Sequence, residues 1–236
     1  MVANPRIIVA LDFEDIISAE KLVAELDPKL CCLKVGKEMF TRFGSAFVKK
    51  LIQQGYPVFL DLKFHDIPNT VAKACLAAAD LGVWMLNVHA SGGRAMLTAA
   101  REAIDKYAGN KPLLIAVTVL TSIGEQDLHE VGVQGTIDAQ VHRLADLTFQ
   151  CGFNGVVCSA QEAPMLKKAY GKNFYCVTPG IRLEDSKADD QKRVLTPVQA
   201  IEAGADYLVI GRPITQSKNP LEVLKKIKLD IAPFIV

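Results

Sequence analysis

Short apolar runs alternate with amphipathic or alanine-rich stretches along the chain, and this alternation constrains the fold more than any other feature. Apolar runs of this length, bounded by polar or glycine-containing stretches, predict buried strands. They lie at 6–11, 30–33, 56–60, 84–88, 113–120, 155–158, 174–177 and 207–210. The stretches between them predict helices at 18–26, 45–54, 70–81, 94–107, 139–150 and 197–203. A glycine typical of a helix C-cap follows several of these helices: Gly55, Gly82, Gly152 and Gly204.

The number and spacing of the strands favour a closed barrel. Eight strands in 236 residues leave about 30 residues per unit, which is the size of one βα repeat. We therefore expect an α/β protein with a (β/α)8 TIM barrel that forms a single domain over residues 1–236. A doubly wound open sheet is the alternative, and the absence of Gly-x-Gly-x-x-Gly after the first strand weighs against it.

Charged residues stand at the ends of the first three predicted strands. Asp12 follows the first, Lys34 the second, and Asp61 and Lys63 the third, with Asp66 just beyond. Because side chains alternate along a strand, Asp61 and Lys63 should face the same way. A buried ion pair that only holds a loop is the plainer interpretation. The repetition at three strand ends favours an active site, since these ends converge on one mouth of a barrel.

A second polar region follows strands seven and eight. Residues 178–182 read Thr-Pro-Gly-Ile-Arg, and residues 211–215 read Gly-Arg-Pro-Ile-Thr. Loops at these positions of a barrel often bind phosphate through backbone N–H groups, and Arg212 can grip phosphate oxygens bidentately. Taken alone, Gly-Arg-Pro could simply be a helix start. The polar segment 183–195 is either a solvated excursion or, as its position behind the phosphate loop favours, a lid over bound ligand.

Composition gives no sign of a nucleic-acid or membrane partner. Half of the residues are hydrophobic, 22% are charged and the formal net charge is +1. No apolar run reaches the roughly 18 residues that span a bilayer, and residues 1–5 do not read as a signal peptide. The six cysteines form no Cys-x-x-Cys pair. We expect reduced, buried thiols and a cytoplasmic protein.

The run Asp-Leu-Lys-Phe-His-Asp-Ile-Pro-Asn-Thr at residues 61–70 resembles the hallmark of the orotidine 5′-phosphate decarboxylase family. The resemblance extends in order through segments at 10–12, 34–36, 117–122, 177–182, 190–193 and 210–215. It implies conversion of orotidine 5′-phosphate to UMP and carbon dioxide, the last step of de novo UMP synthesis. It also implies that neither a metal nor an organic cofactor is needed, and the sequence has no His/Cys/carboxylate cluster at ligand spacing.

The resemblance also implies residue roles. Lys34, Asp61, Lys63 and Asp66 would form an alternating charge array, in which Lys63 protonates C6 of the pyrimidine and Asp61 sits against the substrate carboxylate. Lys34 would form ion pairs with the aspartates and would bind the ribose hydroxyls. The other substrate-binding residues implied are Asp12 for ribose, Thr121 or Ser122 for the pyrimidine, Gln191 to tie the lid to the phosphate, and Pro179, Arg182, Gly211 and Arg212. Family members are homodimers in which Asp66, Ile67 and Thr70 reach the neighbouring site.

Two alternatives stay open at this point. One is a magnesium-dependent phosphosugar decarboxylase or synthase of the same barrel superfamily, which shares an Asp-x-Lys-x-x-Asp core. Such proteins lack the full run at 61–70 and usually add carboxylates for the metal. The other is a catalytically silent barrel that binds a nucleotide or a partner protein. Loss of Lys63 or Asp61 would have indicated it, and both are present.

Overall fold

The computed structural model describes residues 5–183 and 195–235. Within these residues eight parallel strands pair in sequence order, and β8 pairs back to β1 to close the barrel. The strands are β1 (Ile7–Leu11), β2 (Cys32–Gly36), β3 (Val58–Phe64), β4 (Met85–His89), β5 (Leu113–Val117), β6 (Gly155–Val157), β7 (Tyr175–Thr178) and β8 (Tyr207–Ile210). The predicted (β/α)8 barrel is therefore confirmed, and the open sheet is excluded.

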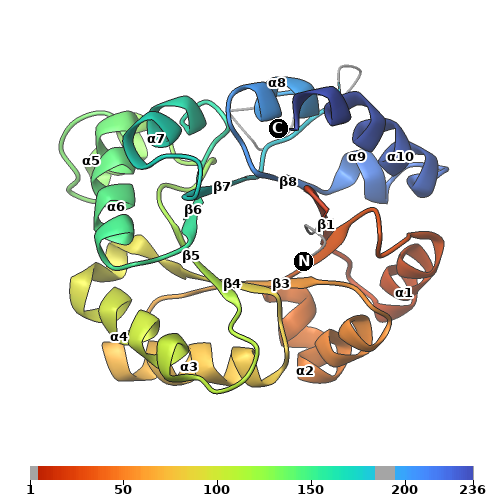
Figure 1. Cartoon of the computed structure of the whole chain (residues 1–236), viewed down its shortest axis with the longest axis horizontal. Helices are drawn as coiled ribbons and strands as arrows, with labels where there is room; N and C mark the ends of the chain where they lie inside the picture. The colour runs from red at the N-terminus through yellow and green to blue at the C-terminus, as the bar shows by residue number, and fades with distance from the viewer. Residues whose placement is uncertain (1–4, 184–194, 236) are drawn as a thin grey trace.

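Helices surround the ring of strands, as Figure 1 shows in a view along the barrel. They are α1 (Ile16–Glu25), α2 (Lys37–Gln53), α3 (Pro68–Asp80), α4 (Gly93–Lys106), α5 (Glu125–Glu130), α6 (Ile137–Gln150), α7 (Ala163–Tyr170), α8 (Pro197–Glu202), α9 (Arg212–Thr215) and α10 (Pro220–Ile231), with 3₁₀ turns η1 (Ala90–Gly92) and η2 (Ala232–Phe234). All six predicted helices form. The sequence pattern missed the helical segments after β5, β6 and β8 that are only four to eight residues long.

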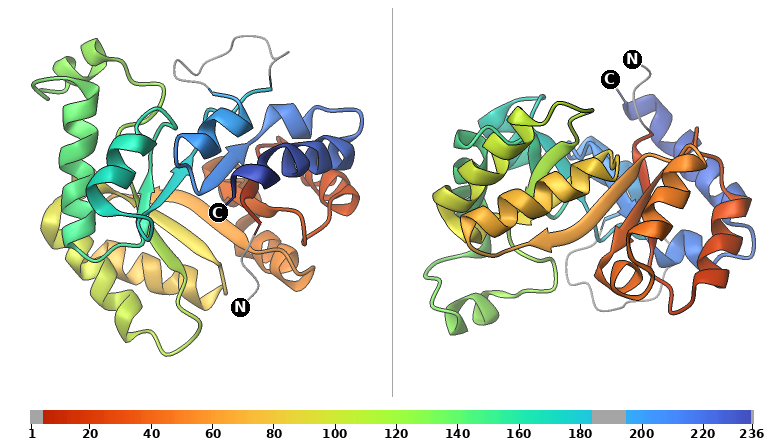
Figure 2. Two further views of the ribbon diagram at one scale, coloured as in Figure 1. Left: turned by 45° about the horizontal axis from the view of Figure 1, so that its top comes forward. Right: turned by 90° about the horizontal axis from the view of Figure 1, so that it is seen from below.

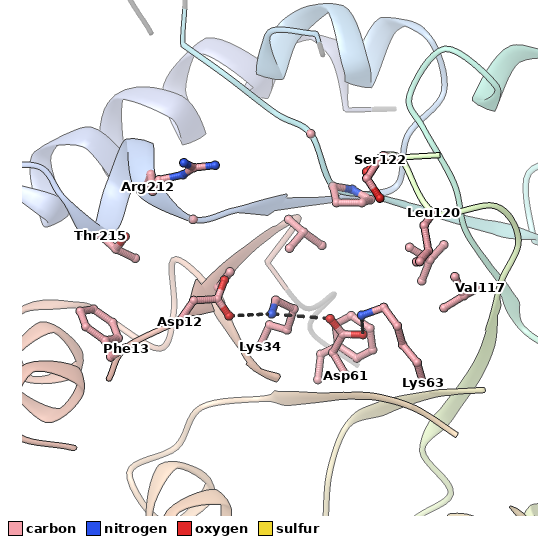
Figure 3. Close-up of a pocket in the computed structure, with 18 of the residues that line it drawn as sticks. Asp12, Phe13, Lys34, Asp61, Lys63, Val117, Leu120, Ser122, Arg212 and Thr215 are labelled. Atoms are coloured by element: carbon pink, nitrogen blue, oxygen red, sulfur yellow. Dashed lines mark hydrogen bonds and ion pairs between the residues drawn. The ribbon is translucent and has the colours of Figure 1, made fainter. Parts of the chain in front are cut away.

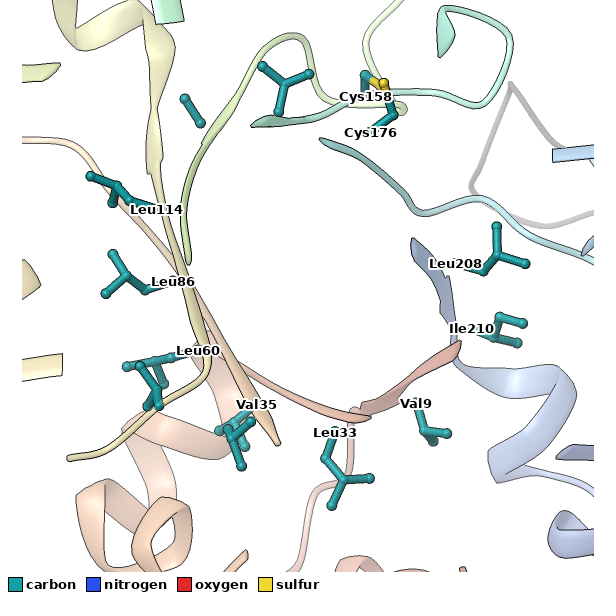
Figure 4. Close-up of a cluster of buried hydrophobic side chains, with 14 of the residues drawn as sticks. Val9, Leu33, Val35, Leu60, Leu86, Leu114, Cys158, Cys176, Leu208 and Ile210 are labelled. Carbon is teal, nitrogen blue, oxygen red and sulfur yellow. The ribbon is translucent and has the colours of Figure 1, made fainter. Parts of the chain in front are cut away.

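Strand side chains alternate between two apolar layers, as the barrel requires. One layer faces the helices and includes Val9, Leu33 and Leu60, which point outward from the strands in Figure 4. The other layer fills the barrel interior, where Ile8 and Phe59 pack together with side chains from most of the other strands. The interior layer forms the floor on which a site at the barrel mouth can rest.

The four glycines predicted as C-caps all have positive φ, between 75° and 101°. This left-handed conformation ends a helix without the steric penalty that a side chain would add. The chain then turns directly into the next strand. The connection from strand to helix after β5 differs from these turns, because its helix α5 stands clear of the ring, as Figure 2 shows.

Two strands continue beyond their apolar runs into the charged residues predicted at their ends. The apolar runs end at residues 33 and 60, whereas β2 continues to Gly36 and β3 to Phe64. Lys34, Asp61 and Lys63 therefore lie inside the strands. They are tolerated inside β2 and β3 because they face a polar cavity rather than the apolar layer. No helix in the described part of the chain is long and apolar enough to cross a membrane.

Candidate active site

A cavity of about 830 Å³ opens at the carboxyl ends of the strands. Its floor consists of interior side chains such as Phe59, Val117 and Val209. Charged and polar residues line its walls. Of the predicted site residues, the cavity lining includes Asp12, Lys34, Asp61, Lys63, Thr121, Ser122, Pro179, Arg182, Gly211 and Arg212.

Strand register explains why the first three strands deliver charges to this cavity. Cys32 and Phe59 belong to the interior layer, so Lys34 and Asp61, each two residues later, face inward as well. Lys34 pairs in register with Ala10 of β1 and Phe59 of β3. Lys34 and Asp61 thus stand beyond the interior apolar residues of their own strands, on the side of the cavity.

Four charged side chains form a continuous row, shown with dashed lines in Figure 3. The Lys34 ammonium donates a hydrogen bond to Asp12 Oδ1 at 3.2 Å and lies 3.5 Å from Asp61 Oδ2. The Lys63 ammonium donates to the other oxygen of Asp61, Oδ1, at 2.6 Å. Lys34 and Asp61 are each only 8% exposed. Negative and positive groups therefore alternate in the order Asp12, Lys34, Asp61, Lys63, and we call this row the charge array.

The charge array keeps its central members ionised. Burial alone would raise the pKa of the Asp61 carboxyl, but the ammonium groups of Lys34 and Lys63 outweigh burial and lower that pKa below its ordinary value. Burial alone would lower the pKa of Lys34, but the carboxylates of Asp61 and Asp12 raise it. At neutral pH Asp61 is therefore a carboxylate and Lys34 an ammonium.

The backbone at Lys63 is unusual. Among the described residues, Lys63 alone combines a side chain with a positive φ, of 53°. Leu60 pairs with Leu86 and Phe64 with Val88, so β3 takes four steps where β4 takes two. This bulge interrupts the regular alternation on which the prediction for Asp61 and Lys63 rested. Their charged ends nevertheless meet, as predicted.

Asn87 of β4 contacts the bulge and was missed by the sequence analysis. It is fully buried. Its Oδ1 accepts a hydrogen bond from the Lys63 backbone N–H at 2.8 Å, and its Nδ2 donates to Asp61 Oδ1 at 2.7 Å. The only signal in the sequence is one amide in an otherwise apolar run. The residues of that run do not indicate which groups the amide contacts.

His89 ends β4 beside the charge array. Its ring centroid lies 5.4 Å from that of His65. Burial, followed by the nearby His65, Lys37 and Lys63, lowers the pKa of His89 to about 4. His89 is therefore neutral at neutral pH and adds no charge to the array.

The loops after β7 and β8 line a separate part of the cavity. Arg212 is the first residue of the short helix α9, and Figure 3 shows its side chain away from the charge array. Arg182 follows β7, and its backbone N–H donates to Leu195 at 3.0 Å. The two ends of the predicted lid, 183–195, are thus held together at the cavity rim. Gln191 lies outside the described residues.

Three predicted residues are not brought into the cavity of their own chain. Asp66, Ile67 and Thr70 are exposed, with Ile67 at 67%, and among the described residues none of them lines the cavity. Asp66 Oδ1 instead accepts a hydrogen bond from the Ile67 backbone N–H at 2.7 Å. Asp66 and Ile67 directly precede α3, and Thr70 lies in its first turn.

Comparison with known proteins gives consistent results. A model of the family described as "Orotidine 5'-phosphate decarboxylase / HUMPS family" matches residues 5–227. A protein of Chromobacterium violaceum named orotidine 5′-phosphate decarboxylase is 60% identical over 229 residues, which are 97% of this chain and 92% of that protein. One of Psychromonas ingrahamii with the same name is 58% identical over 224 residues, which are 95% and 96% of the two chains.

A solved structure of similar shape carries the same name. The crystal structure of orotidine 5′-phosphate decarboxylase from Lactobacillus acidophilus matches with a TM-score of 0.86 and 38% sequence identity. The match covers 97% of this chain and 99% of that one. The likeness therefore extends over the whole barrel, including the strands that carry the charge array.

Proposed function

The chain belongs to the orotidine 5′-phosphate decarboxylase / HUMPS family, and on that premise we propose that the charge array is the catalytic centre of its reaction. The chain is a carbon–carbon lyase that decarboxylates orotidine 5′-phosphate in pyrimidine biosynthesis, as its near relatives are named. The single observation that carries the assignment of the site is the buried Asp61 carboxylate held between two ammonium groups in the cavity wall.

The reaction needs a proton donor and a stabiliser of negative charge at one carbon. When the bond between C6 and the carboxylate breaks, the electron pair stays on C6 and carbon dioxide leaves. Lys63 would donate its proton to C6, and the resulting amine would regain a proton from solvent. Lys63 suits this role because its side chain is 23% exposed and lines the cavity, while Lys34 is committed to Asp12 and Asp61.

Asp61 would lie against the substrate carboxylate, but repulsion between them cannot supply the whole rate enhancement. At about 4 Å two like charges repel by roughly 1 kcal/mol in water and about 4 kcal/mol at an effective dielectric of 20. Enzymes typically remove about 8–23 kcal/mol from a barrier. Electrostatic stabilisation of the developing carbanion by Lys63 must therefore contribute much of the remainder.

The rest of the cavity would hold the nucleotide away from the reacting bond. Asp12 and Lys34 would bind ribose hydroxyls, and Thr121 or Ser122 the pyrimidine. Pro179, Arg182, Gly211, Arg212 and, on the lid, Gln191 would surround the phosphate. Binding energy at this distant group can orient the base over Lys63 and so contribute to catalysis.

A second copy of the chain would complete the site. We propose a cytoplasmic homodimer in which Asp66, Ile67 and Thr70 of each subunit enter the partner's cavity, with no metal or organic cofactor. The exposed positions of Asp66 and Ile67 support this arrangement, because among the described residues neither side chain lines the cavity of its own chain. Asp66 would then extend the alternating charges beyond Lys63.

Turnover of orotidine 5′-phosphate tests the proposal directly. Consumption is followed by absorbance, with and without EDTA, and we expect full activity in both. Loss of activity with EDTA, restored by magnesium, would favour the metal-dependent relatives of the same superfamily. Binding of UMP with no turnover under any condition would favour a silent nucleotide-binding barrel.

A further inference from the structure

We propose that Asn87 is a positioning residue of the decarboxylation, which sets the direction of both Asp61 and Lys63 without touching the substrate. This inference rests on the proposed function, since it assumes that the charge array performs the chemistry. Its starting point is the pair of hydrogen bonds that one buried amide makes to two members of the array.

The orientation of the Asn87 amide is fixed by its partners. The Lys63 backbone N–H can only donate, so the atom that faces it at 2.8 Å must be the amide oxygen. The Asp61 carboxylate can only accept, so the atom that faces it at 2.7 Å must be the amide nitrogen. A flipped amide would lose both bonds in a site from which water is excluded, and asparagine therefore fits this position in one orientation only.

The bond to Lys63 holds an unfavourable backbone conformation. A φ near 53° is uncommon outside turns for a residue that is not glycine, and it persists only where the surroundings impose it. Because β3 bulges here, the Lys63 N–H loses its regular partner on β4, and the Asn87 side chain replaces that partner. The left-handed turn at Lys63 redirects its side chain so that the ammonium reaches Asp61 and the cavity.

The bond to Asp61 acts on the same oxygen that receives the Lys63 ammonium. Asp61 Oδ1 accepts from both Asn87 Nδ2 and Lys63 Nζ, while Oδ2 faces Lys34. Three donors therefore fix the plane of this carboxylate. Asn87 is the neutral one of the three, and among the described residues it is not part of the cavity lining. It can thus act only through Asp61 and Lys63.

Two substitutions separate this role from simple support of the fold. Asn87→Asp keeps an oxygen that can accept from the Lys63 N–H, but it replaces the donor to Asp61 with a second oxygen. Asn87→Ala removes both bonds. Asn154→Ala is the matched control, because Asn154 Oδ1 also accepts a backbone N–H, that of Leu114 at 2.9 Å, at the other end of the barrel.

The readouts are kcat and KM for orotidine 5′-phosphate, the dissociation constant of UMP by calorimetry, and folding by circular dichroism. We expect both Asn87 variants to lower kcat about 100-fold or more, since small displacements of catalytic groups can cost that much. UMP binding should stay within about threefold, because ribose and phosphate contacts remain. Asn154→Ala should leave kcat within about threefold even if its melting temperature falls.

A folded Asn87→Asp or Asn87→Ala enzyme with kcat within threefold of wild type would overturn the proposal. So would equal losses in kcat and in UMP affinity, or failure of both variants to fold, since either result would make Asn87 a structural residue. Wild-type protein is assayed alongside. If the wild-type enzyme shows no turnover, the proposed function fails. If the wild-type enzyme is active and the Asn87 variants are equally active, the proposed function stands and this inference fails.

Discussion

The two sides of the cavity are built differently. On the side of β1–β3, charged groups stand on or next to core strands, and Lys34 and Asp61 are buried and already paired with one another. On the side of β7 and β8, the polar groups stand on loops and on α9, which is only four residues long, and Arg212 is exposed.

This difference suits the tasks proposed for the two sides, which are catalysis and phosphate binding. A catalytic group gains from being fixed before the substrate arrives, because no reorganisation is then needed during the reaction. A phosphate-binding group must admit and release a nucleotide, so it gains from an accessible position near a segment that can close. We therefore expect changes on the first side to affect mainly kcat, and changes on the second side to affect mainly KM.

The largest effect is expected from Lys63→Ala. It removes the proposed proton donor, and general acid catalysis contributes typically 10²–10⁴-fold, so we expect kcat to fall by about 10⁴-fold. UMP affinity should change far less. Steady-state kinetics and calorimetry measure both quantities. Lys106→Ala, which removes an exposed ammonium on α4, is the matched control. A Lys63→Ala enzyme with kcat within tenfold of wild type would contradict the role.

On the opposite side, Arg212→Ala should act through binding. A hydrogen bond to a charged group contributes about 1.5–3 kcal/mol, so KM for orotidine 5′-phosphate should rise roughly 10- to 100-fold. The loss should shrink for orotidine, which lacks the phosphate. Equal losses for both substrates would instead place Arg212 in a structural role.

Gln191 allows this side to be tested for coupling. If Arg212 and Gln191 act on one phosphate through the lid, the double variant should lose less than the sum of the two single losses in free energy. Additive losses would mean that the two residues act independently. The measurement is a double-mutant cycle on kcat/KM, with the orotidine reaction as the reference that lacks the phosphate.

Sequence reasoning recovered the two sides unequally. The strand pattern and the run at 61–70 located Lys34, Asp61 and Lys63 because charges inside core strands are rare and therefore informative. It could not recover Asn87 or the bulge at Lys63, because both depend on the register of β3 against β4, which local sequence does not encode. The role of Gln191 stays a prediction, since that residue lies outside the described part of the chain.

In the proposed dimer, the partner subunit would contribute Asp66 to the cavity, and subunit exchange can test this. Lys63→Ala and Asp66→Asn subunits are mixed after each is shown to be inactive. A symmetric interface lends Asp66 reciprocally, so one site of each hybrid dimer carries both defects and the other carries neither. Random mixing makes roughly half of the dimers hybrid, and about a quarter of all sites should regain activity.

Exchange itself must be shown with tagged subunits, because a dimer that does not exchange would also give no rescue. With exchange demonstrated, persistent inactivity would mean that Asp66 acts within its own chain. No partner residue would then extend the charge array, and the difference between the two sides of the cavity would not depend on a partner.

The smallest effects are expected from two matched glycine substitutions, one on each side. A Cβ added at Gly36 would lie 3.1 Å from Lys34 Nζ, whereas one added at Gly211 would lie 3.6 Å from the Ala10 Cβ, an ordinary contact. Neither glycine has a positive φ. Gly36→Ala must therefore displace the Lys34 ammonium slightly, and we expect kcat to fall several-fold, to about a fifth, with KM little changed.

Gly211→Ala should instead raise KM, since it crowds the backbone proposed to approach the phosphate, and leave kcat nearly intact. Steady-state kinetics on the pair decides the matter: if both variants change kcat alone, or both change KM alone, then the two sides do not divide chemistry from binding.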